Sequence, residues 1–336
     1  MRMSIIGITM GCPVAIGPEI ILRQAGRYRA DGPVTPVVVG DLGVLRRCAG
    51  ELALDVPLSA WIPGTPLPSR SLAVVEVSHL PARELAWGRP DNATAVAMAQ
   101  YIRQGVELVR QGVLHGIATC PISKAALQKA GFAYPGHTEM LADLTGSTDF
   151  AMMMAGQRLR VTLVTIHCPL SEVPAQLTRQ AVARMIGITH RSLQRDFAIA
   201  TPRIAVAGLN PHAGEDGLFG REEQTAIAPA IEQMRRNGLQ VEGPIPPDTV
   251  FFKAASGLYD AVVCMYHDQG LIPFKLLHFK DGVNVTLGLP IVRTSVDHGT
   301  AYDIAGKGVA DPSSLAAAID LAGTISANRK RTDLQP

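Results

Sequence analysis

The sequence has little of what marks membrane-bound, secreted or nucleic-acid-binding proteins. No apolar stretch in its 336 residues approaches the roughly 18 uninterrupted residues of a membrane span. The formal net charge is only +2, and the basic residues are dispersed except at 329–331, which we interpret as a solvated tail, so no nucleic-acid partner is expected. The N-terminus lacks the long apolar region and cleavage site of a signal peptide, so we expect no export and no membrane partner.

Cysteine is scarce and shows no pairing pattern. The five cysteines are odd in number and lack Cys-x-x-Cys spacing, which argues against a disulfide framework. Most lie in or beside apolar runs, as free thiols do in a reducing compartment. We therefore expect a cytoplasmic protein.

Two common nucleotide-binding motifs are also absent. No Gly-x-Gly-x-x-Gly follows a predicted strand. The string 131–139 echoes a phosphate loop but lacks its lysine, which argues against a nucleoside triphosphatase. A glycine before a helix whose first turn carries His137 and Thr138 could still hold one phosphate or carboxylate through free backbone N–H groups. The string alone favours the simpler alternative, a helix cap with Thr138 as N-cap.

Short β-branched runs alternate with longer amphipathic stretches, which predicts an α/β fold. The predicted strands are 4–9, 36–40, 73–77, 116–119, 161–165, 203–207 and 261–265, and the predicted helices are 94–111, 178–196, 222–237 and 313–326. Pro229 should kink the third helix or mark its real start, and Gly238 should end it. The length predicts two domains. A first domain that the chain leaves near 125 and re-enters near 290 fits as well as two consecutive blocks.

Three histidines follow three of the predicted strands. His167 lies in Val-Thr-Ile-His-Cys-Pro, His212 in Asn-Pro-His-Ala-Gly-Glu and His267 in Met-Tyr-His-Asp-Gln-Gly. Ligand crevices of open α/β sheets lie at the carboxyl ends of strands, so the imidazoles could meet there. Three neutral imidazoles with an open fourth position are typical of a catalytic metal. From the spacing alone, a shared metal and three unrelated histidines are equally open.

Polar groups also occur in the apolar segments that follow. Lys275, Asn284 and Arg293 place a cation, an amide and a guanidinium within nineteen residues. Each could be an ordinary side chain with its polar end in water, and Arg293 could instead clamp a phosphate or carboxylate. The three together favour a site for an anionic substrate, because polar groups in such surroundings need partners.

The string 297–312 is Asp-His-Gly-Thr-Ala-Tyr-Asp-Ile-Ala-Gly-Lys-Gly-Val-Ala-Asp-Pro. It resembles the adenosine-binding loop of the isocitrate and isopropylmalate dehydrogenase superfamily, whose members bind NAD without the glycine-rich fingerprint. Tyr302 and Asp311 stand where that pattern has proline and asparagine. The cofactor-binding residues that the resemblance implies are His298, Gly299, Thr300, Ala301 and Asp311.

Together with the strings 9–20, 208–215 and 265–271, this loop is similar to the 4-hydroxythreonine-4-phosphate dehydrogenase family of pyridoxal phosphate biosynthesis. The resemblance implies an isocitrate/isopropylmalate dehydrogenase-like α/β fold, with a central mixed sheet and an active-site cleft between two subdomains. The implied subdomains are 1–125 plus 290–336, and 126–289 with the metal ligands and the dimer interface. Cys12 and Ala15 depart from the aspartate and glycine that family members usually carry.

The resemblance also implies the site residues. His167, His212 and His267 match ligands of a divalent metal, Zn²⁺, Mg²⁺ or Co²⁺, with the third ligand donated across a homodimer interface so that the active site is shared. The residues that match substrate contacts are His137, Thr138, Lys275, Asn284 and Arg293. Lys275 and Asp248 are the candidates for moving a proton.

These assignments predict a metal-dependent, NAD- or NADP-linked oxidation of the C3 hydroxyl of 4-phosphohydroxy-L-threonine. The product would be a 3-oxo acid that decarboxylates to 3-amino-2-oxopropyl phosphate. A dehydrogenase of D-threonate or D-erythronate 4-phosphate stays open, whereas a dihydrodiol dehydrogenase would not need the phosphate contacts. A metal-free phosphotransacetylase-like acyltransferase and a catalytically silent metabolite-binding protein are the alternatives from other classes.

Overall fold

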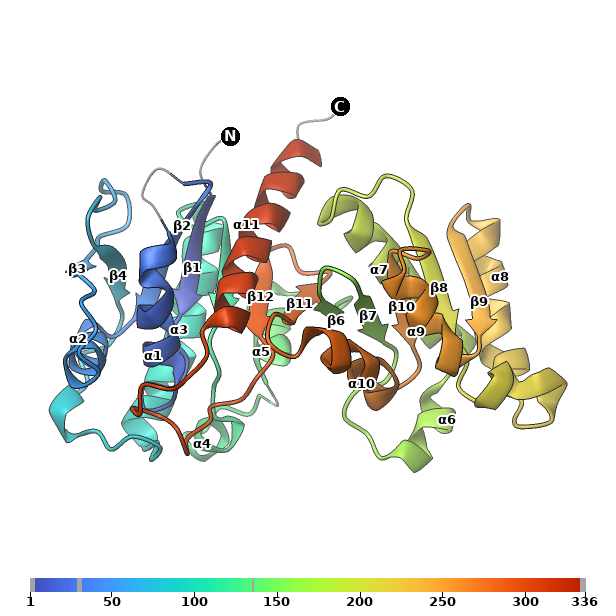
Figure 1. The fold of residues 1–336 in the computed structure, drawn as a ribbon, viewed down its shortest axis with the longest axis horizontal. Coiled ribbons are helices and arrows are strands. Elements are labelled where there is room, and N and C mark those ends of the chain that lie inside the picture. Colours follow the sequence, from blue (N-terminus) through green and yellow to red (C-terminus); the bar gives the residue numbers. More distant parts are fainter. Residues whose placement is uncertain (1–3, 29–31, 135, 333–336) are drawn as a thin grey trace. The chain divides into compact units, whose positions relative to one another are not determined.

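The computed structural model describes residues 4–28, 32–134 and 136–332, which form two compact α/β units (Figure 1). The first unit contains the chain up to Thr148 together with Leu289–Lys330, and the second is built on Asp149–Gly288. The chain thus leaves the first unit and returns to it, but it leaves after residue 148 instead of 125.

The extra residues of the first unit are held by helix packing. The helices α4 (Lys124–Lys129) and α5 (His137–Thr145) both contact α3 (Asn92–Arg110), whose apolar face is buried in this unit. The segment 126–148 therefore shares the core of the first unit.

The strands of the first unit are all parallel. Their order is β3 (Leu58–Ala60), β4 (Leu72–Glu76), β2 (Val34–Gly40), β1 (Ser4–Thr9), β5 (Gly116–Thr119) and β12 (Arg293–Val296). Figure 1 shows α1 (Gly17–Gln24) and α11 (Ser313–Thr332) in front of these strands and α3 behind them. Because helices cover both faces of the sheet, its strands can be continuous apolar runs. Val37–Val39 is such a run, and it is fully buried. The remaining elements are α2 (Leu42–Glu51), η1 (Ala25–Arg27) and η2 (Ala82–Glu84).

The second unit has a mixed sheet. Its order is β11 (Val283–Leu287), β6 (Ala151–Ala155), β7 (Arg160–Leu163), β10 (Ala261–Cys264), β8 (Arg203–Ala207) and β9 (Gln240–Ile245); β6 is antiparallel to both its neighbours and the last four strands are parallel. The helices and turns are α6 (Val173–Gln176), α7 (Arg179–Arg195), α8 (Ala228–Arg236), α9 (Pro247–Ala255), α10 (His267–His278), η3 (Leu170–Glu172), η4 (Pro211–Gly217) and the π-helical turn η5 (Glu223–Ile227).

Helices cover both faces of this second sheet. Side chains of α9 and α10, including Val250 and Phe274, form one core cluster with β7, β8 and β10. On the opposite face Thr162 of β7 lies 2.9 Å from Thr189 of α7, hydroxyl to hydroxyl. The parallel strands are therefore buried on both sides, and their carboxyl ends are left to carry loops.

Several local expectations can be compared with the structure. Pro229 marks the real start of α8, because the turn before it is π-helical, and Gly238 ends that helix with a φ of +85°. The prediction of a solvated tail at 329–331 is wrong for Arg329, which is 7% exposed and donates a hydrogen bond to the carbonyl of Leu289 at 3.2 Å. The segment is part of α11, which continues to Thr332, and Arg331 is exposed. Within the described ranges, no helix has the length and apolar content needed to cross a bilayer. All five cysteines are free thiols.

Candidate active site

Three neighbouring strands of the second unit carry the histidines. β7, β10 and β8 are adjacent and parallel, so their carboxyl ends lie at one edge. His167 follows β7 by four residues, His267 follows β10 by three and His212 follows β8 by five. The predicted placement of all three histidines after buried strands is confirmed.

Two of these imidazoles face each other. The ring centres of His167 and His267 are 5.9 Å apart, with the planes tilted by 39°. Two imidazoles that share a zinc ion at roughly 2.1 Å from each nitrogen have ring centres about 5 Å apart, so small side-chain rotations would let this pair hold one ion. The ring of His212 instead lies 6.1 Å from that of Phe219. In the part of a single chain that the structure describes, no three metal-binding side chains form a group.

His267 has a partner that fixes its ring. Its Nδ1 lies 2.7 Å from Oδ1 of Asp268. A carboxylate can only accept, so Nδ1 carries the hydrogen, and in the neutral ring Nε2 keeps its lone pair for a metal. The donor chemistry of the pair therefore fits a divalent ion.

The loop that carries His212 has an unusual backbone. His212, Ala213, Glu215 and Asp216 have φ values of 53°, 55°, 42° and 55°, in the left-handed region. Such conformations cost on the order of 1 kcal/mol or more per non-glycine residue and persist only where surrounding contacts enforce them.

A buried carboxylate supplies such contacts at the start of this loop. Glu223 is 3% exposed and accepts hydrogen bonds from the backbone of Leu209 and Asn210, at 2.7 and 2.8 Å, and from the Asn210 amide at 2.9 Å. Glu222 accepts a further bond from the same amide at 2.7 Å. Sequence reasoning missed both glutamates; the signal was a carboxylate pair at the start of a helix pattern beside a glycine-rich string.

The second cluster lies in the first unit, at the N-terminus of α5. Gly136 is the N-cap of this helix and Thr138 is already inside its first turn, so the expectation that Thr138 would be the N-cap is wrong. The first backbone N–H groups of a helix have no intrahelical acceptor. This terminus therefore offers the donors that an anion needs.

Cationic and neutral donors surround this terminus. Burial, then the charges of Arg293 and Lys124, hold the pKa of His137 well below its usual value. Arg293 is 2% exposed; burial lowers its pKa to about 9, an effect that Glu139 opposes. Its Nη2 donates to the hydroxyl of Thr119 at 2.8 Å. Nε2 of His137 is buried without a hydrogen-bond partner among the described residues, which is compatible with a ligand at this position.

Lys124 is a functional candidate that sequence reasoning missed. It is the first residue of α4, and its Nζ lies 3.7 Å from the place that a Cβ on Gly136 would occupy. The ammonium group thus approaches the first turn of α5. The rule that located the histidines would have found it, because Lys124 follows the buried strand β5 by five residues.

The other predicted contacts belong to the second unit. Lys275 is half-buried on α10, and Asn284 lies on β11 opposite Met154 of β6. Oδ1 of Asn284 is buried and has no partner in the described part of the chain. Asp248 is exposed in the first turn of α9.

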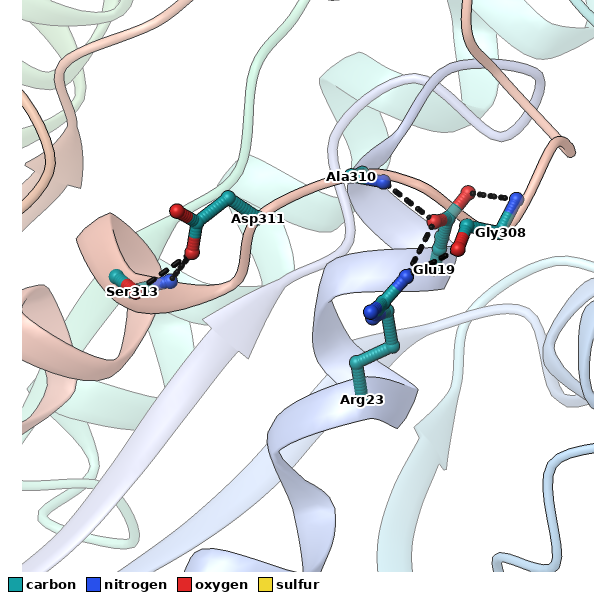
Figure 2. A network of polar contacts seen from close by, with 6 residues as sticks. All are labelled: Glu19, Arg23, Gly308, Ala310, Asp311 and Ser313. Atoms are coloured by element: carbon teal, nitrogen blue, oxygen red, sulfur yellow. Dashed lines mark hydrogen bonds and ion pairs between the residues drawn. The ribbon is translucent and has the colours of Figure 1, made fainter.

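Two residues of α1 form hydrogen bonds to the backbone of the predicted cofactor loop. Glu19, 1% exposed, accepts hydrogen bonds from the backbone N–H groups of Ala310 at 2.7 Å and Gly308 at 3.3 Å (Figure 2). Arg23 donates to the Gly308 carbonyl and lies 3.4 Å from the Glu19 carboxylate. Asp311 accepts hydrogen bonds from the backbone N–H and the hydroxyl of Ser313, the first residue of α11, at 2.9 and 2.6 Å, as Figure 2 also shows.

The same loop also contacts the turn after β1. The carbonyl of Thr300 accepts a hydrogen bond from the N–H of Ile16 at 3.3 Å, and the hydroxyl of Tyr302 lies 3.4 Å from Sγ of Cys12. Burial raises the pKa of the Cys12 thiol, which stays neutral. Two residues that depart from the related sequence patterns thus touch each other. Nε2 of His298 is buried with no partner in the described ranges, which fits a ligand of this loop.

Comparisons with known proteins agree with this architecture. A family model described as pyridoxal phosphate biosynthetic protein PdxA matches residues 33–322. A 4-hydroxythreonine-4-phosphate dehydrogenase of Desulforapulum autotrophicum is 54% identical over 320 residues, which are 95% of this chain and 94% of that protein. An Oceanobacillus iheyensis protein provisionally named D-threonate 4-phosphate dehydrogenase is 43% identical over 322 residues, 95% of this chain and 96% of its own. The crystal structure of the Klebsiella pneumoniae 4-hydroxythreonine-4-phosphate dehydrogenase matches with a TM-score of 0.87 at 43% identity, covering 96% of this chain and 99% of that one. The family resemblance of the sequence is thereby confirmed: the chain belongs to the PdxA family of pyridoxal phosphate biosynthetic proteins.

Proposed function

We propose that this protein is a metal-dependent, NAD- or NADP-linked dehydrogenase of 4-phosphohydroxy-L-threonine. It would oxidise the C3 hydroxyl to a 3-oxo acid that loses CO₂ to give 3-amino-2-oxopropyl phosphate. The observation that carries the proposal is the facing pair of imidazoles, His167 and His267, after two adjacent parallel strands. A pair of this kind suits a metal that activates a hydroxyl, and the relatives of the chain are named as dehydrogenases.

The proposed metal ligands are His167, His212 and His267, for Zn²⁺, Mg²⁺ or Co²⁺. When bound, the metal supplies Lewis acidity toward the hydroxyl oxygen, and the nicotinamide supplies a hydride acceptor. Asp268 holds the His267 ring with Nε2 available, and Glu223 holds the entry of the His212 loop. Both carboxylates thus orient the ligands before the substrate arrives.

The substrate contacts that we propose are His137, Thr138, Lys275, Asn284 and Arg293. In the first unit the N-terminus of α5 would receive the phosphate, with Arg293 and Lys124 supplying positive charge. His137 is neutral near pH 7 because its pKa is lowered, so it serves as a hydrogen-bonding group and adds no charge.

Proton transfer is assigned to Lys275 and Asp248. Lys275 lies eight residues after His267 on α10, which corresponds to about 12 Å along the helix axis. The long lysine side chain can cover part of this distance. Asp248 is exposed at the start of α9. Either group would take part in moving the hydroxyl proton toward water.

The nicotinamide cofactor is proposed to bind the loop that includes His298, Gly299, Thr300, Ala301 and Asp311. The unpartnered Nε2 of His298 supports a ligand there, and the bonds from Glu19 give the loop a fixed shape. A cytoplasmic location is proposed as well, since all five cysteines are free thiols.

We further propose a homodimer with shared active sites. The family resemblance makes His267 the ligand that a second copy donates, and the described residues of one chain contain no three-ligand group, so a second copy would complete the coordination. The helix that begins at His267 also leaves apolar side chains in solvent: Ile272, Leu276 and Phe279 are 68%, 85% and 78% exposed. Their spacing of four and three residues places them on one helix face, which a second copy would bury.

A second candidate substrate is D-threonate 4-phosphate, with D-erythronate 4-phosphate as its near relative. The Oceanobacillus protein supports it, because it matches this chain along nearly its whole length. Cys12 leaves the choice of substrate open, because a neutral thiol stands where family members usually carry an aspartate. Each of these compounds has the phosphate that the N-terminus of α5 would bind together with Arg293 and Lys124.

The test is a comparison of substrates with one metal-loaded preparation. We expect NADH or NADPH formation with 4-phosphohydroxy-L-threonine to exceed that with D-threonate and D-erythronate 4-phosphates in kcat/KM. A larger value for either sugar acid would move the assignment to that substrate. Acetyl transfer from acetyl phosphate to coenzyme A in the presence of a chelator, without NADH formation from any of the three, would contradict the dehydrogenase and favour an acyltransferase.

A further inference from the structure

The side chain of Gln269 lies between two of the histidine loops. It is 6% exposed, its Oε1 accepts a hydrogen bond from the N–H of Met265 at 2.6 Å, and its Nε2 donates to the carbonyl of Gly208 at 2.7 Å. Met265 lies two residues before His267, and Gly208 lies four residues before His212. One primary amide therefore joins the ends of β10 and β8.

The third histidine loop is joined through the same residue. The carbonyl of Met265 accepts hydrogen bonds from the hydroxyl of Thr165 at 2.8 Å and from its backbone N–H at 3.2 Å. Thr165 is 4% exposed and lies two residues before His167. A continuous path of hydrogen bonds thus runs from Thr165 through Met265 and Gln269 to Gly208, and it reaches the loop of each proposed metal ligand.

The start of α10 needs only one of the two hydrogen bonds that the Gln269 side chain makes. Gln269 is the third residue of that helix, and a glutamine there can satisfy a backbone donor just before the helix, as its Oε1 does. The bond from Nε2 to Gly208 serves a different strand, β8, and adds nothing to the helix end. Its effect is to fix the distance between two loops.

The backbone at Gly208 also packs against the loop that carries His212. A Cβ at position 208 would lie 2.9 Å from Cα of Ala213 and 3.1 Å from Oε1 of Glu223, so the backbone at 208 packs directly against the left-handed loop. Any displacement of Gly208 would therefore move Ala213 and its neighbour His212. The Gln269 side chain thus contacts the backbone next to the left-handed residues of the His212 loop.

We propose that Gln269 is a positioning residue that sets the spacing of the three histidine loops of one chain, and thereby the metal affinity of the shared sites to which these loops contribute. It acts through hydrogen bonds to Met265 and Gly208. The inference rests on the proposed metal site. Partners of this kind, one step removed from a metal, typically contribute about 10- to 100-fold to metal affinity.

The decisive variant is Gln269→Glu. The carboxylate has nearly the same shape, keeps the bond from the Met265 N–H, and places a second acceptor against the Gly208 carbonyl in place of a donor. We expect the full-length variant to bind Zn²⁺ at least about 10-fold more weakly in competition with a chromophoric chelator. The visible absorption of the Co²⁺-loaded variant should shift, because the ligand field changes with the loop spacing.

The matched control is Gln194→Glu, in the same unit. Gln194 donates one hydrogen bond to the carbonyl of Ala200 at 3.0 Å, away from the histidine loops, and the exchange is chemically identical. It should leave both the Zn²⁺ affinity and the Co²⁺ spectrum unchanged. A role of Gln269 in folding alone would lower the melting temperature of the metal-free protein and leave both metal readouts at the wild-type values, which would overturn the proposal.

A second variant decides the matter if Gln269→Glu does not fold. Thr165→Val keeps the shape of the side chain and its backbone bond but removes the hydroxyl bond to Met265. It should weaken Zn²⁺ binding by several-fold and shift the Co²⁺ spectrum in the same direction; unchanged values would overturn the inference. If the wild-type protein itself binds neither ion, the proposed metal site fails and this inference with it, whereas tight binding by wild type and variants alike contradicts only the role of Gln269.

Discussion

The two units build their candidate sites in opposite ways. In the first, the cationic groups are set on a helix N-terminus and a buried strand: Arg293 is 2% exposed on β12. In the second, His167 and His212 are exposed on loops whose shape is enforced by buried residues behind them, Glu223 and Gln269. A phosphate needs donors at a fixed place and little else, whereas a metal site must also leave positions open for substrate.

The two units also differ in what they need from a second copy of the chain. The cationic groups at the N-terminus of α5 come from one chain, while the described residues of the second unit bring no three metal-binding side chains together. The first unit should therefore bind phosphate whatever the oligomeric state. The second should bind metal fully only in a dimer.

Replacing one proposed ligand should have the largest effect. His212→Ala is expected to lower kcat/KM by about 10³-fold, because about 4 kcal/mol of metal-dependent stabilisation of the transition state would be lost. Steady-state kinetics with saturating metal measures the effect, and His190→Ala on α7 is the control in the same unit. Near-normal turnover of His212→Ala with metal present would show that no metal held by His212 takes part in the reaction.

Disrupting the proposed dimer should come next and should separate the two units. Leu276→Asp places a charge on the exposed apolar face of α10, where Leu276 is 85% exposed, so its folding within one chain should be unaffected. We expect a monomer by analytical ultracentrifugation, with kcat/KM lowered by about 10²-fold. Binding of inorganic phosphate, followed by calorimetry, should not change.

The control for that experiment is Ile62→Asp, which exchanges another exposed side chain, 71% exposed, in the first unit. It should remain a fully active dimer. A wild-type protein that is monomeric and active at nanomolar concentration would contradict the shared site.

Much of this organisation could be predicted from the sequence. The strands β1, β5 and β8 have the predicted bounds, because each is a β-branched apolar run that ends in turn residues. The strand-end rule correctly predicted that all three histidines follow buried strands, but only two of their rings lie close together in one chain. What gave no signal were strands without that composition: β6 is Ala-Met-Met-Met-Ala, and β12 is Arg-Thr-Ser-Val, polar in sequence yet fully buried.

The contacts that complete the sites could not be predicted in the same way. Arg329 looked like part of a tail, but its guanidinium bonds to the carbonyl of Leu289, forty residues away in the chain. Gln269 reaches Gly208 only because β10 and β8 are neighbours in space. Such interactions depend on strand order, which hydrophobic periodicity does not encode.

Removing the positive charge of Lys124 should have a moderate effect on substrate affinity that is confined to the first unit. Lys124→Met is expected to raise KM for the phosphorylated substrate about 10-fold with little change in kcat, because a charged hydrogen bond to phosphate is worth roughly 1.5 kcal/mol. Lys129→Met, at the last residue of the same helix α4, is the matched control. Zn²⁺ affinity should be unchanged in both; a parallel loss of metal would mean that the two sites are not independent.

The smallest effect concerns His137 and pH. The pKa of His137 is held well below 6.5 by burial and by Arg293 and Lys124, so the folded protein binds fewer protons than the unfolded chain once the pH falls below about 6.5. Stability must then decrease as the pH falls, by up to about 1.4 kcal/mol per pH unit from this group. His137→Gln keeps a polar side chain without a titrating ring and should lose less stability between about pH 7 and pH 5.5, by roughly 1 kcal/mol, in urea unfolding of the ligand-free protein. Because inorganic phosphate bound at this position would accept a hydrogen bond from the imidazolium and favour the charged ring, adding it should reduce the difference between wild type and variant. Equal pH dependence of the two proteins would show that His137 is not buried among cations, and would remove the neutral hydrogen-bonding role assigned to it in the first unit.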